Sequence, residues 1–233
     1  MIPLRDNIPS RTYPLVNTLL IWANFVVFAY ELSRGAALEE FIARWGLVPA
    51  RLASEGLFSP AGLTIFSSMF LHGGWLHILG NMWFLYLFGD NVEDRLGHLR
   101  YLGFYLLCGV ASAATHFLFN PGSAVPVVGA SGAIAGVLGA YFVLFPLARV
   151  AALVWAFFMA WVVEVPAMLF LGLWFIFQFV AGMASLPGAV AGATGGIAWW
   201  AHVGGFVAGV LLVKLLCPAR GPCRYPYDIL PTR

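Results

Sequence analysis

The sequence predicts an all-α protein that crosses a membrane several times. Hydrophobic residues make up 61% of the 233 residues and charged residues only 9%, against about a quarter in an average soluble protein. The few charges are also grouped, which leaves apolar runs of about 18 residues or more, long enough to span a bilayer as helices. Because no basic stripe exists, a nucleic-acid partner is not expected.

Six apolar runs are expected to be transmembrane helices, and together they form one membrane domain over residues 14–216. The first run is not followed by a small-residue cleavage site, so we interpret it as a retained helix and not as a signal peptide. Residues 1–13 form a polar N-terminal segment, and residues 217–233 form a proline-rich basic tail. The six runs lie at residues 14–30, 72–89, 101–119, 126–145, 166–183 and 197–216.

Two of the connecting segments are expected to lie at the membrane surface. Residues 31–71 form a large first loop, in which the pieces 37–45 and 64–70 are amphipathic or interfacial. Residues 150–163 are apolar but short for a crossing, so they fit an interfacial or re-entrant segment better. A charged loop is expected at residues 90–100, between the second and third helices.

The distribution of basic residues predicts the orientation of the six helices. If the N-terminus is cytoplasmic, the inside segments hold nine of the twelve Lys and Arg, and the outside segments hold only Arg34, Arg44 and Arg51. Basic residues are enriched in cytoplasmic loops, so both termini are predicted to be cytoplasmic. A seventh crossing at 150–163 would move the basic tail outside, so a seven-helix arrangement is not predicted.

Few polar or ionisable residues lie inside the predicted helices, where such side chains are costly and are candidates for a functional site. The candidates are His72, His77, His116 and His202, with Asn81, Ser131 and Gln178 as polar partners. His77, Ser131 and His202 each lie about five residues into the second, fourth and sixth helices, which run in the same direction. At a rise of about 1.5 Å per residue, all three lie roughly 8 Å below the outer surface. Asn81 follows His77 by four residues and shares its helix face.

Ser131 is either a packing residue or a nucleophile. It stands on a helix face that is nearly bare, where Gly132 and Gly136 allow another helix to approach closely, and His202 stands on a second face with this spacing, at Gly205 and Gly209. A serine hydroxyl needs a general base, and His202 is the best candidate by depth. A Ser-His-Asp triad is hard to build because Glu164 is the only carboxylate between Asp94 and Asp228.

His77 and Asn81 have two interpretations. Both side chains can donate hydrogen bonds, and with the Ser131 backbone N–H they could stabilise an oxyanion. Alternatively, they form a polar clamp between helices, as membrane bundles also do. The histidines show no metal-ligand spacing, so neither a metal nor an organic cofactor is expected. A channel or transporter with histidines along its pathway is a further alternative, against which the absence of internal repeats argues.

Three motifs in this order resemble the rhomboid family of intramembrane serine proteases over most of the chain. They are His72-Gly-Gly-Trp-Leu-His-Ile-Leu-Gly-Asn81, Gly129-Ala-Ser-Gly132 and Ala201-His-Val-Gly-Gly205. The resemblance implies a six-helix bundle with Ser131 as nucleophile and His202 as general base in a water-filled cavity. It also implies that His77 and Asn81 belong to the oxyanion hole, and that the fifth helix is a lateral gate for substrate.

Further expectations follow from the same resemblance. Glu93 and Arg95 resemble the family's structural Glu-x-Arg pair. The substrates would be transmembrane segments of other proteins in the bilayer, and the membrane would be a bacterial cytoplasmic (inner) membrane, with the active site toward its outer face. The alternative is a catalytically inactive rhomboid-like chaperone or binding protein. Oligomeric state is not predicted.

The sequence departs from the family pattern at two positions. Trp45 is followed by Gly46, where some members have a Trp-Arg pair. The fourth residue after the nucleophile is Ala135, where some members have an aromatic ring packed on the catalytic histidine. Neither departure affects the serine–histidine pair, but the second leaves open what orients His202.

Overall fold

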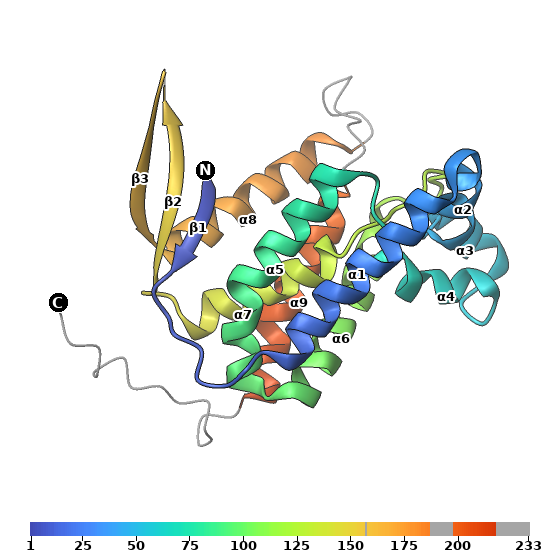
Figure 1. Ribbon diagram of the computed structural model, residues 1–233. Coiled ribbons are helices and arrows are strands. Elements are labelled where there is room, and N and C mark those ends of the chain that lie inside the picture. The colour runs from blue at the N-terminus through green and yellow to red at the C-terminus, as the bar shows by residue number, and fades with distance from the viewer. Residues whose placement is uncertain (157, 187–197, 218–233) are drawn as a thin grey trace.

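The structure is a computed structural model that describes residues 1–156, 158–186 and 198–217. Its body is a bundle of long helices, and each predicted apolar run overlaps one of them (Figure 1). These helices are α1 (Leu15–Ser33), α5 (Trp75–Leu96), α6 (His98–Phe119), α7 (Ser131–Leu144), α8 (Ala167–Ala184) and α9 (Trp199–Leu216). The basic tail beyond residue 217 and the loop at 187–197 lie outside the described residues.

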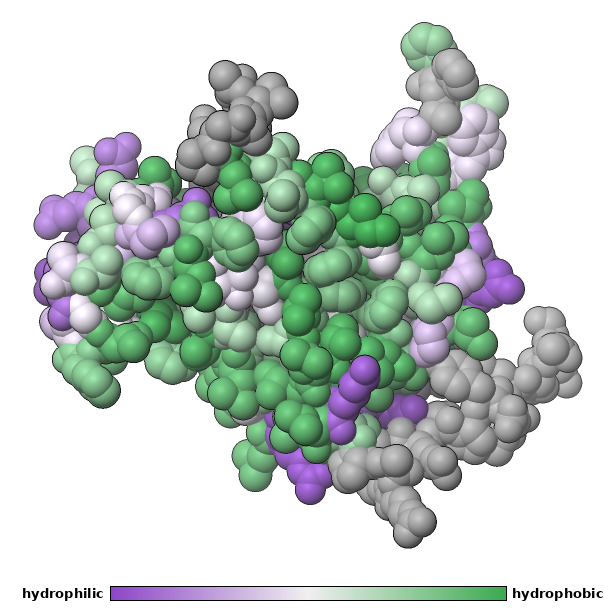
Figure 2. Space-filling model, turned by 180° about the vertical axis from the view of Figure 1, so that it is seen from behind, coloured by the Kyte–Doolittle hydropathy of each residue, from purple (hydrophilic) through white to green (hydrophobic). Residues whose placement is uncertain are grey.

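The bundle has the composition and surface of an integral membrane protein. Within the described residues, four helices are long and apolar enough to cross a membrane: α1, α6, α8 and α9. Helix α5 has 22 residues but carries charges in its last turns, and α7 has only 14. Figure 2 shows a broad hydrophobic surface over one face, with hydrophilic residues mostly at its margins. Such a surface is stable against lipid and would be costly against water.

The long helices alternate in direction, so the bundle has two ends (Figure 1). One is the Ser131 end, where α7 begins, and the other is the Gly97 end, where α5 meets α6. The predicted loop at 90–100 is wrong, because α5 continues to Leu96 and α6 begins at His98. Gly97 alone separates the two helices, and its φ of 76° is a conformation that favours glycine.

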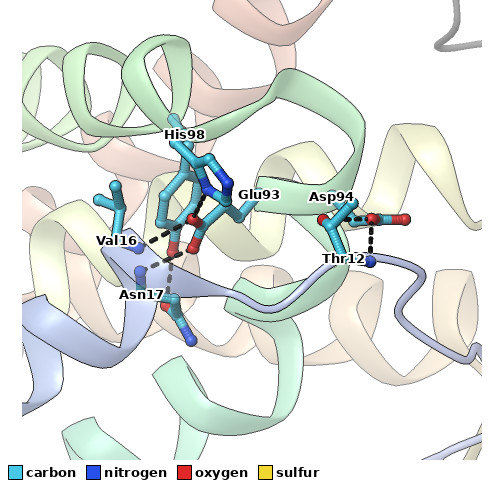
Figure 3. A network of polar contacts seen from close by, with 7 residues as sticks. Thr12, Val16, Asn17, Glu93, Asp94 and His98 are labelled. Atoms are coloured by element: carbon cyan, nitrogen blue, oxygen red, sulfur yellow. Dashed lines mark hydrogen bonds and ion pairs between the residues drawn. The ribbon is translucent and has the colours of Figure 1, made fainter.

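A buried carboxylate fixes the start of α1 at the Gly97 end (Figure 3). Glu93 accepts hydrogen bonds from the backbone N–H groups of Val16 and Asn17, at 2.8 and 2.7 Å, and its carboxylate also contacts the His98 ring. These N–H groups have no acceptor within the first turn of a helix, so Glu93 takes the place of an N-cap. Arg95 is also buried and lies over the ring of Phe145. These contacts of Glu93 and Arg95 agree with the structural role that the resemblance implies for the pair.

Helix α7 lies in the centre of the bundle, in contact with α5, α6, α8 and α9. Its residues 132–141 are all buried, and most of them are small. Its backbone comes into direct contact with that of α9: a Cβ atom added at Gly209 would stand 2.0 Å from the carbonyl oxygen of Gly136. The close approach predicted from the two glycine-faced stretches is confirmed. The predicted start at residue 126 is wrong, because α7 begins at Ser131 and Val127 forms an extended bridge with Leu47.

The first loop packs against the Ser131 end through short helices. Its attachment uses backbone hydrogen bonds between Leu47 and Val127, at 3.0 and 2.8 Å, and one from Gly129 N–H to the Ser68 carbonyl. The predicted amphipathic pieces at 37–45 and 64–70 are helical. The helices of the loop are η1 (Gly35–Ala37), α2 (Leu38–Trp45), α3 (Pro49–Glu55), α4 (Pro60–Ser67) and η2 (Ser68–Phe70).

A three-stranded antiparallel sheet corrects the prediction of an all-α fold. The apolar stretch around 150–163 is a β-hairpin of β2 (Arg149–Ala156) and β3 (Met159–Pro166), and the N-terminal strand β1 (Ile2–Asp6) pairs with β2. Valine and tryptophan recur along the hairpin, and such β-branched and aromatic side chains favour strands. A short apolar run does not by itself distinguish a strand from a helix, which is why the strands were not predicted.

Candidate active site

A cavity of about 600 Å³ lies at the Ser131 end of the bundle. Its walls come from the first loop, from α5 and α6, from the segment before α7, and from the first turn of α9. All four residues that were assigned to the site from the sequence line it: His77, Asn81, Ser131 and His202. Each lies in the first two turns of its helix, so the shared depth predicted from the spacing corresponds to three helix N-termini around one cavity.

Ser131 is the first residue of α7. The N–H groups of a helix's first turn have no acceptor within the helix, so the backbone N–H of Ser131 can donate to a bound group. Gly129, two residues earlier, has a φ of 128°. A Cβ atom at this position would stand 2.7 Å from Nε2 of His77. Glycine therefore allows the His77 ring to lie against the segment that carries Ser131.

The serine and histidine are in hydrogen-bond contact. Nε2 of His202 lies 2.8 Å from Oγ of Ser131. This contact requires that α7 and α9 lie close together, which the glycine contacts described above provide. A serine hydroxyl bonded to an imidazole nitrogen is the arrangement in which the imidazole can take up the hydroxyl proton during nucleophilic attack.

The other nitrogen of His202 contacts Gln178, which was expected from the sequence as a polar partner inside a helix but was not assigned to His202. Nδ1 of His202 lies 2.8 Å from Oε1 of Gln178 on α8. The ring of Trp174, one turn before Gln178, lies 6.0 Å from the His202 ring. Ala135 stands where the resemblance places an aromatic residue in some members. Here α8 supplies two neighbours of the His202 ring, Gln178 and Trp174. One signal was available: Gln178 is the one strongly polar residue in α8, and Trp174 precedes it by four positions.

His77 and Asn81 present donors to the same cavity. The backbone N–H of Gly73 donates to Nδ1 of His77 at 3.3 Å, which leaves the hydrogen on Nε2. The Nδ2 amide of Asn81 is buried without a hydrogen-bond partner in the described part of the chain. An interhelical clamp would need bonds from these side chains to another helix, and the described residues form none. Both side chains instead line the cavity that also holds Ser131.

Glu31 supports the start of α5 and was not singled out in the sequence. Its carboxylate is buried on α1 and accepts the backbone N–H of His72 with both oxygens, at 3.1 and 3.2 Å. The His72 ring lies 5.1 Å from the His77 ring in an edge-to-face arrangement. The carboxylate therefore fixes the backbone that leads into His77. A signal for this role was its place as a carboxylate at the end of an apolar helix.

The fold and the site together define a helical membrane protein with a serine–histidine pair inside its bundle. Comparison with known proteins agrees: residues 61–219 match the Rhomboid domain. This chain belongs to the rhomboid family.

Three relatives illustrate the match. The chain is 32% identical to Rhomboid-like protein 11, chloroplastic, of Arabidopsis thaliana, over 67% of this chain and 53% of the relative. It is 30% identical to Rhomboid protease GluP of Bacillus subtilis, over 57% and 24%. It is 31% identical to Presenilin-associated rhomboid-like protein, mitochondrial, of Bos taurus, over 83% and 46%. The chain thus spans about half, or less, of the length of these relatives.

Proposed function

We propose that this protein is an intramembrane serine endopeptidase that cleaves transmembrane segments of other membrane proteins. The observation that carries the proposal is the 2.8 Å contact between Nε2 of His202 and Oγ of Ser131, in a cavity that also holds His77 and Asn81. Membership of the rhomboid family supports it, and one relative is named a rhomboid protease.

The first half of the reaction forms an acyl-enzyme. Ser131 Oγ attacks the carbonyl carbon of the scissile peptide bond while Nε2 of His202 takes the hydroxyl proton. The tetrahedral intermediate then collapses, and His202 gives this proton to the leaving amine as the C–N bond breaks. The products of this half are a free amine and an ester between Ser131 and the carbonyl side of the substrate.

Three donors stabilise the oxyanion of the tetrahedral intermediate. They are the backbone N–H of Ser131, the Nε2–H of His77 and the Nδ2–H of Asn81. Donors that are already in place before the reaction stabilise developing charge strongly in a site with few competing waters. Because the Gly73 N–H occupies Nδ1 of His77, this ring offers its other nitrogen as the donor.

The second half of the reaction hydrolyses the ester. A water molecule in the cavity attacks the acyl carbon, His202 takes the water proton, and the proton returns to Ser131 Oγ as the ester bond breaks. A transmembrane substrate must first unwind, because the peptide bonds of a helix are covered by their neighbours. Substrates with small or helix-breaking residues near the cut are therefore expected to be cleaved fastest.

We propose that the long helices cross the membrane six times, with both termini in the cytoplasm and the cavity toward the outer face of a bacterial inner membrane. The alternating helix directions (Figure 1) and the predominance of basic residues in the segments assigned to the inside support this arrangement. The membrane domain then comprises residues 14–216, with the loop 31–71 at the outer surface, and α8 borders the route by which a substrate helix enters from the lipid.

Cleavage of reporter transmembrane segments by the full chain in liposomes tests the function. The wild-type chain is expected to release two fragments from at least one segment of a small panel, and Ser131→Ala and His202→Ala are expected to abolish release. A fluorophosphonate probe is expected to label the wild-type chain and neither variant. Ser54→Ala, in an exposed position on α3, is the matched serine control and is expected to cleave and label normally.

Two results would contradict the proposed function. If Ser131→Ala still cleaves a segment that the wild-type chain cleaves, Ser131 is not the nucleophile and the proposed function is wrong. If no segment is cleaved and no probe reacts with the folded wild-type chain, the inactive binding protein becomes the better interpretation.

A further inference from the structure

The amide of Gln178 is buried in an interface where an apolar side chain would pack well. Gln178 is only 5% exposed, and burying an amide is costly unless it is hydrogen-bonded. Around it, α8 and α9 meet through aromatic rings: Phe175 stacks on Phe206 at 4.7 Å, and Phe177 meets Trp199 edge to face at 5.7 Å. Packing alone therefore does not account for an amide at this position.

The partner of the amide is the nitrogen of His202 that faces away from Ser131. Oε1 of Gln178 lies 2.8 Å from Nδ1, and a carbonyl oxygen can only accept a hydrogen bond. The hydrogen of the neutral imidazole must then be on Nδ1, which leaves the lone pair of Nε2 toward Ser131 Oγ. The other tautomer would place a hydrogen on Nε2, and His202 could not take the serine proton.

We infer that Gln178 is a positioning residue that selects the Nδ1–H tautomer of His202 and fixes the direction of its ring. The inference rests on the proposed protease function and adds Gln178 of α8 to the Ser131–His202 pair as a third, positioning residue. A neutral amide fixes the tautomer as a carboxylate would, but it adds no negative charge beside the imidazolium that forms during the reaction. This choice suits a site inside a membrane, where a buried carboxylate is expensive.

The two histidines of the site are thereby held in opposite tautomers. Gly73 N–H donates to Nδ1 of His77, so this ring is a donor at Nε2 toward the cavity. Gln178 accepts from Nδ1 of His202, so this ring is an acceptor at Nε2 toward Ser131. One chemical group thus serves as oxyanion donor in one place and as base in the other, because different partners occupy the second nitrogen.

The direct test is the tautomer of His202 in the wild-type chain. Nitrogen-15 NMR of histidine-labelled protein in lipid bilayers distinguishes a protonated from an unprotonated ring nitrogen, and the His202→Ala spectrum assigns the signal. Hydrogen on Nδ1 at neutral pH is the expected result. Hydrogen on Nε2 in the folded wild-type chain would overturn the inference, and this measurement needs no variant at Gln178 and no peptide substrate.

Two substitutions of Gln178 separate positioning from packing. Gln178→Met keeps the length of the side chain but removes the acceptor, and it is expected to slow fluorophosphonate labelling of Ser131 by about 10- to 100-fold. Gln178→Glu keeps the acceptor and adds a charge that stabilises the imidazolium form of His202. As the pH is lowered, the labelling rate of this variant is therefore expected to fall at a pH about one unit higher than that of wild type. Ile176→Leu, exposed on the same helix, is the control and should match wild type.

Wild-type labelling by Gln178→Met, together with an unmoved pH profile for Gln178→Glu, would show that the contact is only structural. If Gln178→Met does not fold, the pH profile of Gln178→Glu and the wild-type tautomer decide. Labelling and tautomer are measured without peptide cleavage. If Ser131→Ala still cleaves peptides, the proposed function fails, whereas the tautomer result stands by itself.

Discussion

Gly205 on α9 lies against Gly132 on α7 so closely that a Cβ atom added at Gly205 would stand 2.0 Å from the Gly132 carbonyl oxygen. Gly132 directly follows Ser131, and Gly205 follows His202 by three residues. The contact that lets two helix backbones meet is therefore next to the contact between Ser131 and His202, the proposed nucleophile and base. The approach of the two helices and the geometry of the Ser131–His202 contact depend on the same pair of bare faces.

Substitution of Gly205 by alanine is expected to lower the rates of Ser131 labelling and cleavage more strongly than it lowers the stability of the fold. The added methyl group must push α7 and α9 apart by about 1 Å, and a misplacement of this size can cost about 100-fold in rate. The rate of Ser131 labelling and of reporter cleavage, compared with the melting temperature, checks this. Gly103→Ala on α6 is the matched control, since a Cβ atom there meets nothing within 4 Å. Equal losses in both variants would contradict the argument.

The glycine contact also shows how far the sequence could lead. The spacing of Gly132, Gly136, Gly205 and Gly209 predicted which two helices meet, because only residues without bulk allow backbone contact. The partner of His202 was not predictable, because it depends on how α8 is rotated against α9. Composition alone also did not predict the extended backbone at residues 126–130 or the strands of the hairpin, because apolar residues occur both in helices and in extended segments.

The two side-chain donors of the proposed oxyanion hole are expected to act on turnover and not on substrate binding. His77→Ala and Asn81→Ala should each lower kcat by about 100- to 1,000-fold, because the donors bind a charge that develops only in the transition state. Steady-state kinetics with a reporter segment in liposomes measure kcat and KM separately. An unchanged kcat with a raised KM would instead assign these side chains to substrate binding.

Removal of the Glu93 carboxylate is expected to destabilise the bundle without altering the site. Glu93→Ala leaves the N–H groups of Val16 and Asn17 without their acceptor, and each unpaired buried donor costs about 1–3 kcal/mol. Thermal unfolding in detergent measures the loss. Asp94→Ala is the control, because its hydrogen bonds to Thr12 are exposed and should contribute less. A loss for Asp94→Ala as large as that for Glu93→Ala would argue against this account.

The hairpin is expected to lie at the lipid–water boundary, as was predicted for residues 150–163. Trp155 is 64% exposed and Val162 60%, which favours contact with lipid. The outer edge of β3, however, has no pairing strand in the described part of the chain, and unpaired backbone groups are not tolerated in the hydrocarbon core. Tryptophan is itself typical of the interface.

A nitroxide label at residue 158 tests this placement. In a background without the native cysteines, the label is expected to be more accessible to oxygen than to a water-soluble nickel chelate, and a label at Ser54 is expected to show the reverse. A label at 158 with the accessibility of the Ser54 label would place the hairpin in water.

Attachment of strand β1 is expected to strengthen as the pH falls. Asp6 accepts hydrogen bonds from the Tyr141 hydroxyl and from Asn91. Burial raises its pKa from 3.8 to about 6; the Tyr141 hydrogen bond opposes this shift, and the nearby charge of Asp90 adds to it. Between these two values the attached strand binds the proton more tightly than the detached strand, so the free energy of detachment increases as the pH falls through about 6.

Hydrogen exchange of the β1 amides in nanodiscs, corrected for the intrinsic exchange rate at each pH, measures this free energy. Protection is expected to be about tenfold higher at pH 5 than at pH 7, because one pH unit below a pKa corresponds to a tenfold change in the ratio of protonated to ionised carboxyl groups. Asp6→Asn cannot ionise, and its protection should therefore change little over this range. Protection that falls on acidification in the wild-type chain, or that rises equally in Asp6→Asn, would show that another group controls the attachment of the strand.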